Sequence, residues 1–110
     1  MILIKNFRTL AQAKKDIETL QKQIEQTEQY IPLIENYNPQ TFTQYVINEY
    51  THEGNVIRTA ENLNQLGHRI DGRKIEKQNI SAIIQSRSNP YDLLHKEVRR
   101  LYLKKIHSRT

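Results

Sequence analysis

The chain has 110 residues, of which 36% are hydrophobic and 26% charged, and it contains no cysteine. This length suits one domain of ordinary size, and the absence of cysteine excludes disulfides, thiolate metal sites and cysteine nucleophiles. The apolar run that opens the chain, Met1 to Ile4, is too short for a signal peptide or a membrane span, so we expect a single cytoplasmic domain over residues 1–110 with no membrane partner.

Positive charge is concentrated toward the end of the chain. The formal net charge is +5, and residues 68–110 alone hold eleven basic residues against four acidic ones. Such an excess attracts polyanions, although a solvated basic tail on a soluble protein has the same composition. The modest hydrophobic content also predicts a thin core, which either long helices or a second copy of the chain would complete.

Residues 1–37 are predicted to form a long dimerisation helix. Apolar or small residues recur there in alternating steps of three and four, which is a heptad pattern: Leu10, Ala13, Ile17, Leu20, Ile24, Thr27, Ile31 and Ile34. We assign dimer contacts to Leu10, Ile17, Leu20, Ile24 and Ile31. The residue types favour a parallel two-stranded coil, but the flanking positions carry few complementary charges, so the orientation stays open. We expect Pro32 to break the last heptad. The alternative is that the stripe packs onto its own domain.

Residues 38–88 are predicted to form a helix-turn-helix core. The first helix is expected to begin at Asn38-Pro39 and to end at Gly54, with Phe42, Val46, Ile47 and Tyr50 as its apolar residues. A second helix is expected from Asn55 to Leu66, with Gly67 as its terminator. Its predicted buried face consists of Ile57, Ala60, Leu63 and Leu66.

The segment 68–75 contains Asp71-Gly72, the dipeptide that favours a tight hairpin turn, so a small hairpin could form there. A third helix follows from Glu76 to Ser86, anchored by Ile80, Ile83 and Ile84. A last, basic helix occupies residues 89–110 and is expected to be capped by Ser88-Asn89-Pro90. Its apolar stripe, Leu94, Val98, Leu101 and Tyr102, could pack on the core, pair with a second chain, or do both.

The open face of the third helix is rich in groups that both donate and accept hydrogen bonds, as is needed to contact base edges in a major groove of DNA. The predicted DNA base contacts are Gln78, Asn79, Ser81, Ala82 and Gln85, with Ala82 offering an apolar contact to a thymine methyl. Cations on both sides of this helix would hold phosphates. The predicted DNA backbone contacts are Arg69, Arg73, Lys74, Lys77 and Arg87.

The segment from Thr59 to Gly67, the Gly72-Arg73 linker and the segment from Asn79 to Ile84 together resemble the helix-turn-helix of phage and mobile-element proteins, including the DNA-binding part of large serine recombinases. The resemblance covers about a third of the chain. The resemblance does not include the recombinases' catalytic domain with its serine nucleophile. It therefore implies a binding module without strand-exchange chemistry. A dimeric transcriptional regulator, or an accessory protein of a phage or plasmid, that binds double-stranded DNA is the function it implies.

Enzymatic alternatives have little support in the sequence. His52, His68, His95 and His107 are not spaced for a metal site and are expected at the surface or at groove edges. The pair Arg100 and His107 weakly resembles the arrangement of some small helical ribonucleases, but the polar residue that usually lies beside such an arginine is Leu101 here. We therefore expect no enzymatic activity and no cofactor. A coiled-coil adaptor or antirepressor that binds an acidic protein partner is the principal alternative.

Overall fold

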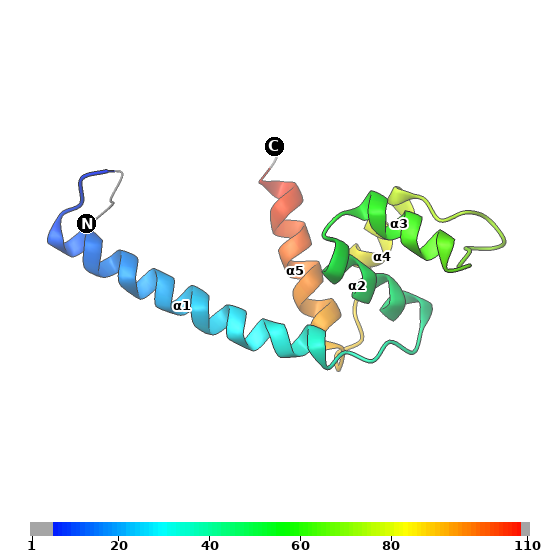
Figure 1. The fold of residues 1–110 in the computed structure, drawn as a ribbon, viewed down its shortest axis with the longest axis horizontal. Helices are drawn as coiled ribbons and strands as arrows, with labels where there is room; N and C mark the ends of the chain where they lie inside the picture. The colour runs from blue at the N-terminus through cyan, green and yellow to red at the C-terminus, as the bar shows by residue number, and fades with distance from the viewer. Residues whose placement is uncertain (1–5, 109–110) are drawn as a thin grey trace. The chain divides into compact units, whose positions relative to one another are not determined.

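The computed structural model describes residues 6–108 and is all-helical over that range, as expected from the sequence. Its helices are α1 (Leu10–Glu35), α2 (Phe42–Glu53), α3 (Val56–Gln65), α4 (Lys77–Gln85) and α5 (Leu93–His107) (Figure 1). The chain divides into two compact units, Met1–Pro32 and Leu33–Thr110, which are described separately.

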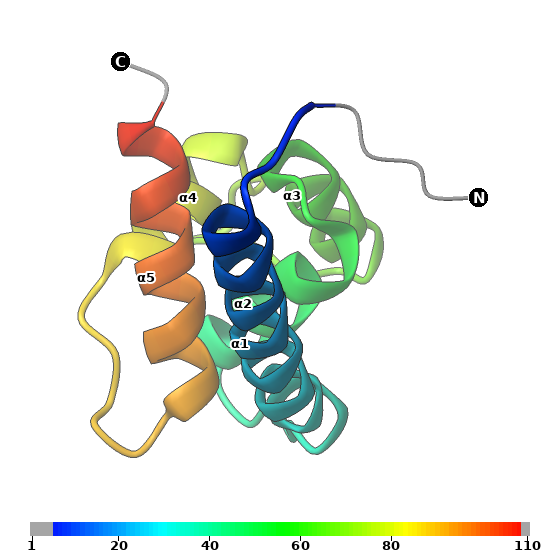
Figure 2. The same cartoon turned by 90° about the vertical axis from the view of Figure 1, so that its left-hand side faces the viewer.

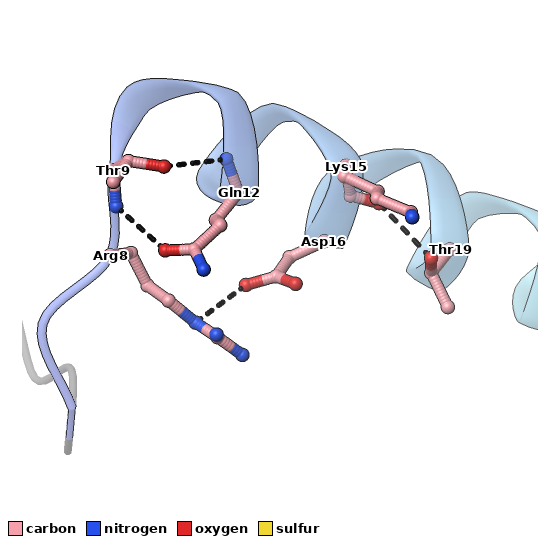
Figure 3. A network of polar contacts seen from close by, with 6 residues as sticks. All are labelled: Arg8, Thr9, Gln12, Lys15, Asp16 and Thr19. Carbon is pink, nitrogen blue, oxygen red and sulfur yellow. Dashed lines mark hydrogen bonds and ion pairs between the residues drawn. The ribbon is translucent and has the colours of Figure 1, made fainter.

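The helix of the first unit, α1, begins at a well-formed cap. The Thr9 hydroxyl accepts a hydrogen bond from the Gln12 backbone N–H at 3.2 Å, and the Gln12 side chain accepts one from the Thr9 N–H at 3.0 Å (Figure 3). This reciprocal pair satisfies two amides that a helix start would otherwise leave without partners. Arg8 adds an ion pair to Asp16 at 3.1 Å, which holds the preceding turn against the helix.

The prediction that Pro32 breaks the helix is wrong. Helix α1 continues through Pro32 to Glu35. Proline lacks the amide hydrogen that would bond one turn back, but the hydrogen bonds on either side preserve the helix. No α1 residue is buried.

The second unit is a bundle of four helices around an apolar core. Helix α2 contacts α3, α4 and α5, and α4 also contacts α3 and α5. Figure 2 shows the loop between α4 and α5 passing alongside α5 before the chain turns back into that helix. The buried hydrophobic residues are Val46, Ile47, Ala60, Leu63, Ile75, Ile80, Ile84, Leu94 and Val98.

Helix α2 begins later than predicted. Its N-cap is Thr41, which forms a capping box with Gln44, whereas Asn38 lies before the helix. The box satisfies two backbone amides at once, an advantage that the Asn38-Pro39 start does not offer. Gly54 ends α2 with a φ of 68°, in the left-handed region, as expected for a glycine terminator.

Helix α3 is capped by Asn55, whose side chain accepts hydrogen bonds from the backbone N–H groups of Ile57 and Arg58. Its predicted buried face is half wrong. Ile57 and Leu66 are 49% and 68% exposed, whereas Thr59 is fully buried. The Thr59 hydroxyl donates to the Asn55 carbonyl at 2.8 Å, so its polar atom is satisfied inside the helix and its methyl is free to pack.

The connection between α3 and α4 is a structured loop that Figure 1 shows extending from one end of the bundle. The predicted hairpin is reduced to an isolated antiparallel bridge between Ile70 and Arg73, closed by Asp71 and Gly72, which both have positive φ. Asn64 fixes the loop to α3: its amide donates to the Ile75 carbonyl and its oxygen accepts from the Ile75 N–H, both at 2.8 Å. The Asn64 side chain therefore satisfies both backbone groups of Ile75, as a neighbouring strand would in a sheet.

Helix α5 is capped by Asp92, not by the Ser88-Asn89-Pro90 segment. One Asp92 oxygen accepts from the His95 N–H at 2.9 Å and the other accepts from the Tyr37 hydroxyl at 2.7 Å. Burial and the adjacent Asp92 raise the pKa of Tyr37. Asp92 therefore bonds to a backbone amide of α5 and to a side chain before α2, and α5 begins directly after it.

Candidate nucleic-acid interface

Helix α4 is held in the bundle by two fully buried residues, Ile80 and Ile84, while the third predicted anchor, Ile83, is half-buried. Because α4 contacts α2, α3 and α5, the side opposite its buried isoleucines is the side available to a ligand. Gln78 and Ala82 are exposed there, one helical turn apart. These two residues are the centre of the candidate interface.

The expectation that Ser81 and Gln85 lie on the open face is not met. Both are half-buried on the side of α4 that faces α5. The Ser81 hydroxyl lies 2.8 Å from the Tyr102 hydroxyl and also accepts a hydrogen bond from the Gln85 amide at 2.9 Å. Arg99 reaches across from α5 to donate to the Gln85 carbonyl at 2.9 Å. These polar groups join α4 to α5, because a hydroxyl beside a packed helix needs a partner there.

Asn79 also has a role within the fold. Its side-chain oxygen accepts a hydrogen bond from the Glu76 N–H at 2.9 Å, which caps the start of α4. The Gln78 amide is hydrogen-bonded to the Glu76 carboxylate, but Gln78 stays exposed. Of the five predicted base contacts, therefore, Gln78 and Ala82 alone are exposed.

Two hollows flank the first turn of α4. The larger, about 570 Å³, is lined by Ile70, Asp71, Arg73, Lys74, Glu76 and Asn79. The smaller, about 290 Å³, is lined by Tyr50, Gly54, Asn55, Val56, Ile57, Lys77, Tyr102, Lys105 and Ile106. Each hollow is lined by two basic side chains, so cations lie on both sides of the helix that presents Gln78. The larger hollow also contains the carboxylates of Asp71 and Glu76, so the net positive charge is at the smaller hollow.

The predicted phosphate-binding cations differ in whether their charged groups are already bonded within the fold. Arg73, Lys74, Lys77 and Arg87 are exposed. Arg69 is also exposed, but its guanidinium donates to the carbonyls of Asn64 at 3.0 Å and His68 at 2.6 Å. A cation at the end of α3 stabilises that helix terminus, so Arg69 has a structural role in this bundle.

Sequence reasoning missed Lys105. It lies 28 residues after Lys77 along the chain, yet both line the smaller hollow. No local pattern could have paired them, because their proximity follows from the packing of α5 against α2 and α4. The Tyr50 and Tyr102 rings meet edge to face, with centroids 5.8 Å apart, and form the wall of the same hollow.

The predicted dimer contacts on α1 are all exposed, from 45% for Ile31 to 73% for Leu10. Ile17, Leu20 and Ile24 fall between these values. An exposed apolar row of this length is typical of a helix surface that another helix covers.

The histidine prediction needs one correction. His95 was expected at the surface, but it is buried. Its ring lies between α4 and α5, with Nε2 3.2 Å from the Ile84 carbonyl. Residues 6–108 contain no group of three or more His, Cys, Asp or Glu side chains placed to hold a metal ion. Arg100 is paired with Glu97 of its own helix, which raises the pKa of the Arg100 guanidinium.

None of the helices between residues 6 and 108 has the length and apolar character to cross a membrane. Comparisons with protein-family models, with curated proteins and with solved structures give no match for this chain.

Proposed function

We propose that the protein is a sequence-specific double-stranded DNA-binding protein, a dimeric regulator or an accessory protein of a phage or plasmid that acts in the cytoplasm. One observation carries the proposal: α4 presents Gln78 and Ala82 outward between two hollows that each contain two cations. A helix that enters a major groove has phosphates on both flanks, so basic side chains on both sides of α4 suit this ligand, with Asp71 and Glu76 as the acidic groups beside Arg73 and Lys74.

In the proposed complex, α4 lies in the major groove. Gln78 exchanges its bond to Glu76 for a two-point contact to an adenine, and Ala82 contacts a thymine methyl. Arg73 and Lys74 bind phosphates of one DNA backbone beside the groove, while Lys77 and Lys105 bind phosphates of the other. With two exposed side chains facing the bases, most of the affinity comes from the phosphates, and sequence preference is confined to a few base pairs.

The helix-turn-helix assignment belongs to this proposal. Helices α3 and α4 are in contact, and we assign them to the first and second helix of the motif. Their connection, residues 66–76, is longer than the usual turn of about three to four residues, but the Asn64 side chain holds it against α3. A dimer through α1 would then read two half-sites about 10 base pairs apart.

The test is selection of bound sites from a random pool of DNA duplexes, followed by measurement of the affinity of the Gln78→Ala variant for the selected site. We expect enrichment of a short motif and a loss of about 1–3 kcal/mol that is confined to one base position. Gln26→Ala, an exposed glutamine on α1, is the matched control. A pool without enrichment, with weak binding that does not respond to salt, would instead support an adaptor for an acidic protein.

A further inference from the structure

The heptad seam of α1 is not interrupted at Pro32. Because the helix runs unbroken to Glu35, its core positions reach from Leu10 to Ile34, and its flanking positions include Glu35. Pro32 lies at an outer position of the heptad, away from the seam. The seam offers eight consecutive core positions and has no buried residue.

We propose that the seam is covered by α1 of a second copy running in the opposite direction. The proposal deepens the dimer included in the proposed function, but it does not depend on DNA binding. Two features of α1 support this orientation: the sizes of the core side chains and the order of the flanking charges.

The core side chains are complementary in size when the helices are antiparallel. In that register Ala13 of one copy faces Ile31 of the other, and Thr27 faces Ile17. Each small residue then meets a large one, which fills the layer without a void. The Thr27 hydroxyl donates to the Gln23 carbonyl of its own helix at 2.8 Å, so its methyl can face Ile17 with no polar group left unsatisfied.

A parallel pair packs less well. There each core residue faces its own copy, so Ala13 meets Ala13 and Thr27 meets Thr27. Both layers are too small for the spacing that the isoleucine layers impose. The remaining core residues are large enough in either orientation and do not distinguish the two.

The flanking charges favour the same answer. The positions that follow each second core residue are Lys14, Gln21, Glu28 and Glu35, positive near one end and negative near the other. An antiparallel pair brings these positions together, so Lys14 of each copy lies alongside the stretch that holds Glu28 and Glu35 of the other. The dimer gains this attraction twice.

In a parallel pair the same positions face Thr9, Asp16, Gln23 and Tyr30 of the other copy. None of these is a cation, so Glu28 and Glu35 find no partner. Asp16, the single acidic residue among them, is already paired with Arg8 of its own chain. The antiparallel dimer is therefore the better match in charge as well as in size.

The orientation sets where the second units attach. In an antiparallel pair the two chains leave the coil at opposite ends, about 39 Å apart for a helix of 26 residues. In a parallel pair they leave at the same end.

Cysteine cross-linking tests the orientation, because the natural chain has no cysteine. Ala13→Cys and Ile31→Cys variants are purified separately and oxidised, alone and after mixing through a dissociated state. The antiparallel dimer predicts that disulfides form only in the mixture, between positions 13 and 31, which lie within bonding distance only across the antiparallel seam. Lys15→Cys, on the outer side of α1, is the control and should remain uncross-linked in every case.

Cross-linking of each variant with itself, and no gain on mixing, would overturn the proposal, and so would sedimentation of the natural chain as a monomer at high concentration. A charge exchange gives a second measurement that needs no cysteine. Lys14→Glu should weaken the dimer by roughly two- to thirtyfold, and adding Glu28→Lys with Glu35→Lys should restore it. Equal dimer affinity in all three proteins would contradict the charge argument. No arm of the test contains DNA, so its failure leaves the DNA-binding proposal untouched.

Discussion

The two lysines of the smaller hollow offer the sharpest test of how the bundle binds DNA. Lys77 and Lys105 come from different helices, and their joint contact with one phosphate strand depends on the packing of α4 and α5. We expect the double variant Lys77→Ala/Lys105→Ala to lose affinity for all duplex sequences to a similar extent. Its salt dependence should fall as well, because each phosphate contact releases counterions.

The magnitude follows from the number of cations available. The two hollows supply four, and Arg87 after α4 makes five per protomer. At a slope of about −0.9 for each contact, log affinity should change by about −4.5 per decade of salt, or roughly 500-fold between about 50 and 200 mM. The double variant retains three cations, so its slope should be about −2.7 and its loss roughly 40-fold.

Fluorescence anisotropy with a labelled duplex at several salt concentrations measures this slope directly. The matched control is Lys15→Ala/Lys22→Ala, which removes the same charge from the exposed outer side of α1. Its slope should stay close to that of the natural chain. If the control variant lost as much slope as the double variant in the hollow, net charge alone would explain binding. The assignment of Lys77 and Lys105 would then be wrong.

Asn64→Ala should lower the free energy of unfolding by about 1–3 kcal/mol, because it leaves the Ile75 amide and carbonyl without partners at a buried position. Denaturant melts measure this loss, with the exposed Gln65→Ala as the control. Equal stabilities of the two variants would contradict the assignment. Tyr37→Phe should cost about 1–2 kcal/mol at neutral pH through the lost bond to Asp92. Because the pKa of Tyr37 is raised, its stabilisation is fully present below about pH 10 and is lost as the pH rises toward its higher folded value. In an absorbance titration Tyr37 of the natural chain should ionise late, and the Tyr37→Phe variant should lack that contribution; an unchanged titration would refute the argument.

Helix content and order followed from the sequence because periodicity and terminators act locally. Gly54 and Asn55 mark one helix end and the next helix start, and the structure has both. The starts of α2 and α5 were misplaced for a related reason. The Asn38-Pro39 and Asn89-Pro90 pairs are reasonable starts, but Thr41 and Asp92 satisfy more backbone and side-chain partners.

The candidate site was predicted only in part, because a helical wheel does not show what packs against each side. Ser81 and Gln85 are as polar as Gln78, yet the Ser81 hydroxyl is hydrogen-bonded to Tyr102 of α5 and to Gln85, so neither side chain lies on the open face. Lys105 enters the site by the same packing, 28 residues beyond Lys77. Both outcomes depend on contacts between α4 and α5, which no pattern within either helix encodes.

The tight turn between α3 and α4 has a practical consequence. Asp71 and Gly72 are exposed at its tip, and the residues that hold the loop in place, Asn64 and Ile75, lie on the helix side of it. A few extra residues or a small fluorophore inserted at the tip should therefore leave the bundle folded. A dye placed there would sit beside Arg73 and Lys74, where its emission could report ligand arrival in real time.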